Sequence, residues 1–526
     1  MSSLLSPIER SRRSRLLVLM TGLAISVITT AGLIVYATAY IPPSVQALNA
    51  KATAGISATA AFNGDIIGIS DGSYAFDTNR SDGSLKQQAS SKFRAGDKSG
   101  ANSLWLRAVQ QDTNDAEALI YLEDLRVLNS NKPYITLVVG TTITSKDLSA
   151  TSIGSDILQG AYTAQKEYND GSKQVGGKQL RLLIANSGSL ADSATTVAQQ
   201  IVQAVQHDST LIGVMGWPFS GQTLSAVKVL SKVHIPMVSA TSSSDDLTAI
   251  SPFFFRVVPS NKSQAIAGAL YLEQQLHAKK VALFLDPNNS YSSSLANDFS
   301  AKFINDGNEI VATEEYKVGD TTTMPLLLQH ALVSKPDAIY FAGYASDLNV
   351  LLQSQPKLQI MGGDALYDVG GYTTTPPINF SLLHFTSFAS PETWNILKIP
   401  DPPFFTLYRN NFDPQNQHAG AYGFVRPTGN TMLSYDAMLA LLQGASNALT
   451  EKIALTPITL SKGLAKIYGT QAIQGITGQI SFGSNGDPIN KALLVLHVTS
   501  GYFTVVQAQG GVQGCFFVGQ CSNTNG

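Results

Sequence analysis

Alternation of strand-like and helical segments is the feature that most constrains how this chain of 526 residues can fold. From residue 133 on, apolar runs such as Tyr134–Gly140 and Thr210–Gly216 alternate with amphipathic stretches such as Ser155–Tyr168 and Thr223–Val233. Strands that alternate with helices of roughly 10–15 residues predict βαβ units and parallel sheets covered on both faces. Because about 400 residues exceed what one hydrophobic core usually serves, we expect two such sheets in two lobes.

Composition excludes several classes of protein. Hydrophobic residues make up 44% of the chain, and 35 basic against 37 acidic residues give a formal net charge of −2. A disordered chain would be less apolar and a nucleic-acid-binding protein more basic, so we expect neither.

The sequence contains no GxxxxGK[ST], HExxH or GxSxG motif, and its seven histidines are scattered. We therefore predict a protein that is not an enzyme and that needs no cofactor and no metal ion.

The N-terminal segment is predicted to cross a membrane. Residues 16–40 carry no charge, and a run of this length spans a hydrocarbon core of about 30 Å. Four arginines between positions 10 and 15 precede it, so residues 1–15 are predicted to lie in the cytoplasm and the rest of the chain outside. The alternative is a cleaved signal peptide, whose apolar region is normally about 7–15 residues long.

The two cysteines both lie in the C-terminal tail, residues 511–526. An exterior location permits a disulfide between Cys515 and Cys521 that closes a small loop. The other interpretation is two free thiols in a frayed terminus. Neither pattern is that of a disulfide framework or a zinc site.

Between the anchor and the main domain, the sequence predicts a linker followed by a small helical element. Residues 41–84 are rich in Ser, Gly, Ala, Asn and Asp, which is typical of a mobile linker, and only Gly64–Ser70 has strand-like character. Residues 85–132 show apolar side chains at helical spacing, with breaks at Gly96 and at 112–115. This spacing resembles a single tetratricopeptide-like hairpin; alternatively, the segment is a helical stalk that packs on the next domain.

Polar residues follow the ends of the predicted strands in the main domain. Ser220 stands just before a helix, a hydroxyl-rich loop runs from Thr241 to Ser244, and Asp364 follows a late strand. Ligands of open α/β sheets bind outside the carboxyl ends of strands, so we expect these residues at one site. Ser220 can also be an ordinary helix cap. Such a site would hold a zwitterion: hydroxyl and backbone N–H groups would bind its carboxylate, and Asp364 would bind its ammonium group.

The order of several strings resembles the type I periplasmic binding proteins, and among them the branched-chain amino-acid (Leu/Ile/Val) substrate-binding family of ABC transporters. The similarity covers about residues 133–510. It includes GSDILQGAYTAQKEYN at 154–169, IGVMGWPFSGQTLSAV at 212–227, IPMVSATSSSDDLT at 235–248, VALFLDPNNSYSSSLANDF at 281–299, IYFAGYASD at 339–347 and MGGDALY at 361–367. The collinear order of these strings carries the assignment, since no single string is a signature.

The resemblance implies an α/β fold of two Rossmann-like lobes, which are joined by three hinge crossings and close on a ligand. Lobe one would comprise residues 133–257 and 388–476, and lobe two residues 258–386 and 477–510. The predicted transmembrane helix and helical hairpin would precede this two-lobed domain.

By matching position, the resemblance implies a role for residues at the strand ends. Ser220 would bind the carboxylate of the ligand, and Asp364 would pair with its ammonium group. Tyr291 and Tyr344 match two tyrosines of the second lobe. Retention of this polar set implies an amino acid or a close analogue as the ligand.

Four further positions bear on the same site. Thr241 and Ser243 match a pair that contacts the ligand through backbone and hydroxyl groups. Ile153 replaces the aromatic residue that the family has beside its first helix, and Trp217 stands where a small residue is common. The match therefore does not specify which ligand side chain is accepted.

Together these observations predict an extracytoplasmic solute-binding receptor that is anchored in the cell membrane by a single helix. It would capture an amino acid or a similar small ligand by hinge closure and deliver it to an ABC-type permease. The alternative is a membrane-tethered sensor or scaffold, in which the same fold and the helical hairpin engage a partner protein. Nucleic acid is not expected as a partner.

Overall fold

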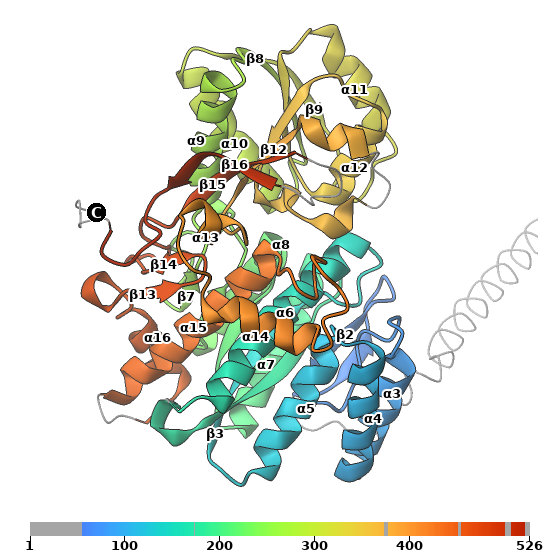
Figure 1. The fold of residues 1–526 in the computed structure, drawn as a ribbon, viewed down its shortest axis with the longest axis vertical. Coiled ribbons are helices and arrows are strands. Elements are labelled where there is room, and N and C mark those ends of the chain that lie inside the picture. The colour runs from blue at the N-terminus through green and yellow to red at the C-terminus, as the bar shows by residue number, and fades with distance from the viewer. Residues whose placement is uncertain (1–54, 173, 373–376, 451–453, 500–505, 521–526) are drawn as a thin grey trace, which may run out of the picture. The chain divides into compact units, whose positions relative to one another are not determined.

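The computed structural model describes residues 55–172, 174–372, 377–450, 454–499 and 506–520 (Figure 1). The predicted cytoplasmic tail and transmembrane anchor, residues 1–40, lie outside this part of the chain. Among the residues described, no helix is both long enough and apolar enough to cross a membrane. The described residues belong to one compact unit, Ala52–Gly526.

The first sheet has seven strands in the order β1-β2-β4-β3-β5-β6-β7. The strands from β4 to β7 pair in parallel, whereas β1 and β2 are antiparallel additions at one edge. Every residue of β4 and β5 is buried, as expected for strands covered on both faces. The bounds are β1 Ala58–Ala60, β2 Ile66–Ser70, β3 Tyr134–Thr141, β4 Gln179–Asn186, β5 Leu211–Gly216, β6 Met237–Ser239 and β7 Phe254–Arg256.

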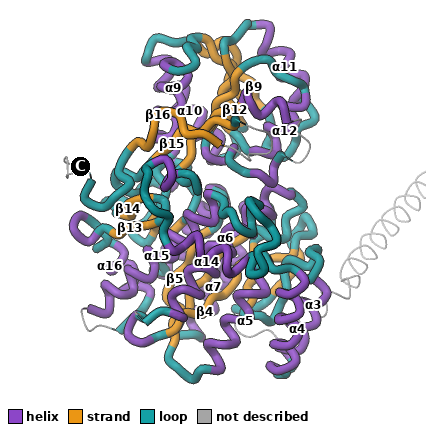
Figure 2. Tube along the Cα trace, viewed as in Figure 1, coloured by secondary structure: helices purple, strands orange, loops and turns teal. Residues whose placement is uncertain are grey.

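Helices pack around this first sheet, which with them forms lobe one (Figure 2). Helix α6 packs against α15, and α7 packs against α8. The carboxyl ends of β3 and β5 lead into α6 and α8, so these two helices begin at the edge of the sheet where a ligand is expected. The bounds are α6 Leu148–Asp170, α7 Ala191–His207, α8 Ser220–Leu230, α13 Thr393–Ile396, α14 Pro403–Phe412, α15 Gly429–Thr450 and α16 Pro457–Leu464.

The prediction of a mobile linker over residues 41–84 is wrong for its described part, because β1 and β2 extend the first sheet there. The strand-like character predicted for Gly64–Ser70 is confirmed, since β2 lies in that segment. Strand β2 pairs with β4 in the register Gly68↔Asn186. Gly68 has φ +144°, and a Cβ there would lie 2.0 Å from the Ser57 carbonyl oxygen. The segment is held by backbone pairing at a sheet edge, which its weakly periodic, small residues do not reveal.

Three helices follow within the predicted helical element 85–132, namely α3 (Gly83–Arg94), α4 (Lys98–Gln111) and α5 (Ala116–Asn129). Helix α5 packs on β4 and α6, so the segment is attached to lobe one. Lys86 on α3 is fully buried, and its ammonium group lies 2.9 Å from the Glu117 carboxylate of α5. The likeness to a tetratricopeptide hairpin stays a prediction.

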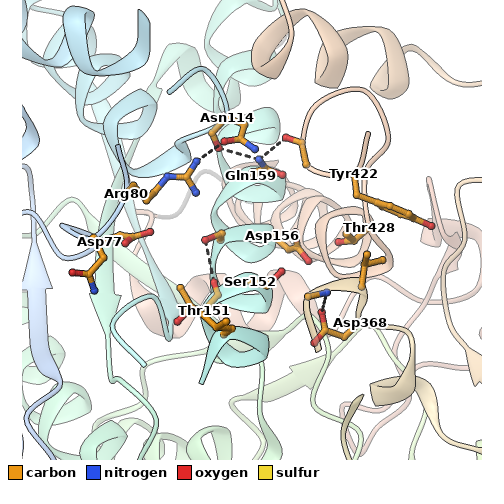
Figure 3. A pocket seen from close by; sticks show the side chains of 16 residues that line it. Asp77, Arg80, Asn114, Thr151, Ser152, Asp156, Gln159, Asp368, Tyr422 and Thr428 are labelled. Atoms are coloured by element: carbon orange, nitrogen blue, oxygen red, sulfur yellow. Dashed lines mark hydrogen bonds between the residues drawn. The ribbon is translucent and has the colours of Figure 1, made fainter. Parts of the chain in front are cut away.

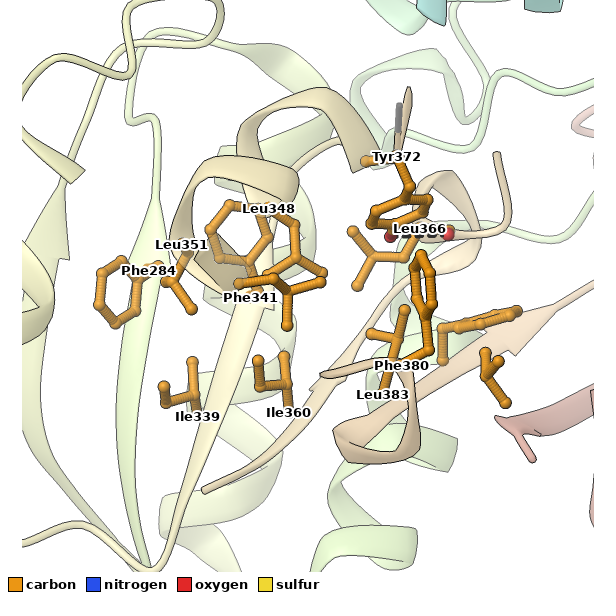
Figure 4. Close-up of a cluster of buried hydrophobic side chains, with 14 of the residues drawn as sticks. Phe284, Ile339, Phe341, Leu348, Leu351, Ile360, Leu366, Tyr372, Phe380 and Leu383 are labelled. Atoms are coloured by element: carbon orange, nitrogen blue, oxygen red, sulfur yellow. Dashed lines mark hydrogen bonds between the residues drawn. The ribbon is translucent and has the colours of Figure 1, made fainter. Parts of the chain in front are cut away.

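The second sheet, in the order β16-β15-β12-β11-β10-β8-β9, forms lobe two. Strands β9 to β12 pair in parallel, and β15 and β16 add antiparallel strands at the other edge. Phe284, Phe341 and Leu348 belong to its buried core, which Figure 4 shows between strands and α12. The bounds are β8 Lys280–Leu285, β9 Glu309–Glu315, β10 Ala338–Ala342, β11 Gln359–Gly362, β12 Leu383–Ser387, β15 Leu493–Val498, β16 Val506–Gln513, α9 Asn261–Gln274, α10 Ser290–Asn305, α11 Met324–Val333 and α12 Ala345–Gln353.

The chain passes between the two lobes three times: from β7 to α9, from β12 to α13, and from the hairpin of β13 (Ile473–Gly475) and β14 (Gly478–Ile480) to β15. The buried Arg256 ties the first passage to the third, because its Nε lies 2.6 Å from the Asp487 carboxylate. Near the third passage, the Cys515 N–H donates to the Asn490 carbonyl at 2.8 Å. Cys515 is disulfide-bonded, and the other cysteine of the sequence, Cys521, lies outside the described residues.

Candidate functional site

A narrow cleft lies between the lobes, where the carboxyl ends of their strands meet. Its volume is about 40 Å³. Ligand pockets usually measure roughly 300–1,000 Å³, so the two lobes leave little space here. The lining residues are Ile153, Pro218, Phe219, Ser220, Thr241, Tyr291, Tyr344, Asp364, Ala365, Tyr367, Asp368 and Asn430.

The wall contributed by lobe one presents hydroxyl groups and a helix N-terminus. Ser220 is the first residue of α8, and its hydroxyl oxygen accepts the Ser244 N–H at 3.2 Å. The Thr241 hydroxyl donates to the Pro218 carbonyl at 2.8 Å, which fixes the loop after β6 against the loop after β5. The first N–H groups of a helix have no partner within the helix and favour an anion. This wall therefore suits a carboxylate.

The wall contributed by lobe two is built around Asp364. One carboxylate oxygen of Asp364 accepts the Gln264 amide at 2.9 Å and the Tyr291 hydroxyl at 3.0 Å. Gln264 is itself held, because its side-chain oxygen accepts the Thr386 hydroxyl at 2.7 Å. Burial raises the pKa of Asp364 to about 6, although hydrogen bonds from Gln264 and Tyr291 lower it. The carboxylate is thus ionised at neutral pH and suits an ammonium group.

Direct contacts join the two walls. The Phe219 ring of lobe one meets the Tyr344 ring of lobe two edge to face, with centroids 5.5 Å apart. Beside the cleft, the Ser244 hydroxyl donates to the Ser290 carbonyl at 2.9 Å. These contacts account for the small volume, and the lobes must separate before a ligand can enter.

Five of the seven predicted contact residues line the cleft, and two do not. Trp217 is fully buried, and a Cβ at Gly140 would lie 2.6 Å from its ring. Its indole fills the space above Gly140 of β3. The prediction that Trp217 contacts the ligand is therefore corrected. Ser243 is also buried: its carbonyl accepts the Asn261 N–H at 2.7 Å where the chain enters lobe two. The residues that line the cleft are Ser220, Thr241, Tyr291, Tyr344 and Asp364.

Sequence reasoning missed several lining residues. Phe219 adjoins Ser220, and Asp368 follows Asp364 by four residues, so both lie in loops that were already recognised. Asp368 is buried, accepts the Ser149 hydroxyl of α6 and thereby links the lobes. Asn430 comes from α15, far along the chain, and no local signal marks it.

The profile of the family described as the receptor family ligand binding region matches residues 157–501, about two thirds of the chain. No curated protein matches the sequence significantly.

Several solved structures share the fold. A leucine binding protein from Thermotoga maritima superimposes with a TM-score of 0.60 at 22% identity, over 72% of this chain and 99% of that one. A branched-chain amino acid transporter substrate binding protein from Streptococcus pneumoniae, solved with isoleucine, gives 0.58 at 22% identity over 72% and 99%. A solute binding protein of an ABC transporter from R. palustris, solved with 4-hydroxybenzoate, gives 0.58 at 14% identity over 73% and 98%. Identities this low establish the fold alone.

Proposed function

The chain belongs to the receptor family of ligand binding regions, and on that premise we propose that it is an extracytoplasmic receptor that closes two lobes on an amino acid or a similar small ligand. The observation that carries this proposal is the polarity of the cleft. Ser220 and the N-terminus of α8 form one end, and Asp364 forms the other. A zwitterion has the complementary charges, because its carboxylate would meet the helix and its ammonium group would meet Asp364.

Hinge closure follows from the size of the cleft and the contacts across it. A volume of about 40 Å³ does not admit a free amino acid, so binding requires a more open arrangement. A ligand that contacts both walls then favours closure by its differential affinity for the two arrangements. The three passages between the lobes are where such a rotation would occur.

Two roles fit such a receptor, and we propose delivery to an ABC-type permease as the first. Solved proteins of the same fold include substrate binding proteins of such transporters. The second role is that of a membrane-tethered sensor or scaffold. It is favoured by helices α3 to α5, which precede the family match at residue 157 and which a transport receptor does not require.

A thermal-shift screen of the detergent-purified full chain tests the ligand. Candidates are the twenty amino acids and, because one structural neighbour was solved with 4-hydroxybenzoate, aromatic carboxylates that lack an ammonium group. A micromolar ligand at millimolar concentration should add about 4 kcal/mol to the free energy of unfolding. We expect a response to one class of amino acids that is lost in Asp364→Ala. A response only to carboxylates without an amine would refute the amino-acid assignment. No response to any candidate would refute the proposal that the ligand is an amino acid or a similar small carboxylate.

Uptake measurements then separate the two roles. Cells that have lost the chain should fail to accumulate the identified ligand if it serves a permease. Normal uptake in those cells would exclude delivery and leave the sensor or scaffold.

A further inference from the structure

A second, larger cavity of about 500 Å³ lies beside the ligand cleft (Figure 3). One face of α6, from Leu148 to Gln159, forms its floor. The N-terminal segment contributes Asp77 and Arg80 on one side, and lobe two contributes Asp368 on the other. Asp368 also lines the ligand cleft, so the two spaces are neighbours.

Asp77 is the most informative residue of this cavity. It is only 7% exposed, and burial raises the pKa of its carboxyl to about 6, although the nearby charges of Lys86 and Arg80 lower it. Its backbone N–H donates to the Glu117 carboxylate at 3.1 Å, which fixes the residue in place, and Figure 3 shows its side chain directed toward the cavity. The two cations therefore do not offset the full cost of burying this carboxylate. A ligand that brings positive charge would remove that cost.

Two further buried carboxylates, Asp156 of α6 and Asp368 of lobe two, line the same cavity. Burial raises the pKa of each to about 7, and the negative charge of Asp368 contributes to the rise at Asp156. The Thr428 hydroxyl and the Asn430 amide, the latter at 3.5 Å, donate to Asp156 and lower its pKa, but they do not offset the effect of burial. Both carboxylates would gain from a nearby cation.

The described lining residues offer little positive charge to balance these carboxylates. Arg80 is their single basic residue, and its guanidinium is already paired with Asp112 through contacts of 2.6 and 3.0 Å. The acids do not converge on one point either, since no three acidic, His or Cys side chains of the described chain are arranged to hold a metal ion. They are spread beside a helix face that is ~16 Å long at about 1.5 Å per residue. A matching ligand is elongated and carries separate positive charges.

We propose that this cavity binds an aliphatic polyamine, a linear alkane chain with two or more ammonium groups. One ammonium group would pair with Asp77 and another with Asp156 and Asp368, while the methylene groups lie along α6. Because α6 belongs to lobe one and Asp368 to lobe two, a bound polyamine bridges the lobes and favours their closure. The cavity shares only Asp368 with the ligand cleft, so the proposal does not depend on the amino-acid assignment.

Calorimetric titration of the full chain with spermidine and putrescine, at matched ionic strength, tests the proposal. We expect saturable binding of one molecule per chain and a loss of affinity of about tenfold or more in Asp77→Asn, since one charge pair is removed. Asp401→Asn is the matched control, because Asp401 is exposed and lies outside the cavity. The control should bind like the wild type.

Folding of the test variant is checked independently. Without amine, Asp77→Asn should melt at or above the wild-type temperature, since the raised pKa of Asp77 means that its surroundings disfavour the charged form. Ser155→Lys is a second variant, which places an ammonium group in the cavity and should abolish binding. Equal spermidine affinity in Asp77→Asn and wild type would overturn the proposal. So would binding that magnesium chloride of equal ionic strength reproduces, since that would be a non-specific counterion effect.

Discussion

The two walls of the cleft differ in both charge and construction. Among the described lining residues, lobe one contributes hydroxyl groups, Phe219 and a helix N-terminus, whereas lobe two contributes both carboxylates, Asp364 and Asp368. The walls also differ in how they are held. Ser220 is placed by a local strand-loop-helix unit, but Asp364 depends on Gln264, a residue from a distant helix. The polar groups that would orient the proposed zwitterion are therefore divided between the lobes.

The largest expected effect is the loss of the acidic end. Asp364→Ala removes the partner of the ligand ammonium group and leaves that charge buried and unpaired on binding. We expect a loss of about 2–5 kcal/mol of binding free energy for the amino acid found in the screen. Titration calorimetry measures it. Wild-type affinity in this variant would contradict the proposed pairing of Asp364 with the ligand ammonium group.

A pair of glycines, one on each wall, tests the difference in construction. At Gly363 of lobe two, a Cβ would lie 2.3 Å from the Tyr291 hydroxyl and 2.6 Å from a Leu295 methyl group. Gly363→Ala should therefore lower the free energy of unfolding by about 1–3 kcal/mol through overpacking. At Gly221 of α8, the nearest atom would be 3.4 Å away, so Gly221→Ala should be neutral or stabilising by roughly 0.4–1 kcal/mol.

Denaturant unfolding of both variants measures these effects. Equal effects of the two substitutions would show that the walls are packed alike, which would contradict the comparison.

Acid pH should weaken ligand binding through the lobe-two wall alone. The Asp364 carboxylate binds a cation only when it is ionised, and its pKa is about 6. Affinity should be full above that pKa and fall by about tenfold at pH 5 as the carboxylate is protonated. Asp368, whose pKa is raised to about 7, titrates in the same direction. Binding measured from pH 8 to pH 5 tests this, with Asp364→Asn as the variant that should lack the step near pH 6.

The smallest effect on ligand binding is expected from a substitution on the lobe-one wall. Ser220→Ala removes one hydroxyl, but the N–H groups at the start of α8 remain available to the carboxylate. A loss of roughly 0.5–1.5 kcal/mol of binding free energy is expected. If calorimetry showed a larger loss here than in Asp364→Ala, the polar ends of the cleft would be assigned the wrong way round.

Local patterns in the sequence predicted most of the α/β fold. The strands β3, β4 and β5 stand out because each contains a run of buried apolar residues, and helices follow them at regular spacing. Strand β2 lies in the segment Gly64–Ser70, which the sequence marked as strand-like. Strand β1 was not predicted, because an edge strand is held by backbone hydrogen bonds and needs little side-chain pattern. The place of Trp217 was also predicted wrongly. Its ring packs inward against Gly140, a residue of another strand, and the residues next to Trp217 in the sequence do not reveal this contact.

The sequence by itself determined which elements form and which polar residues stand at strand ends, because periodicity and loop position are local properties. Only the tertiary structure decided which side chains meet. Asp77, Asp156 and Asp368 are far apart in the chain, yet they line one cavity because α6 lies between the N-terminal segment and lobe two. Asn430 reaches the cleft for the same reason, since α15 packs along α6. Burial then gave these carboxylates raised pKa values, a property that a residue acquires from its surroundings and not from its neighbours in sequence.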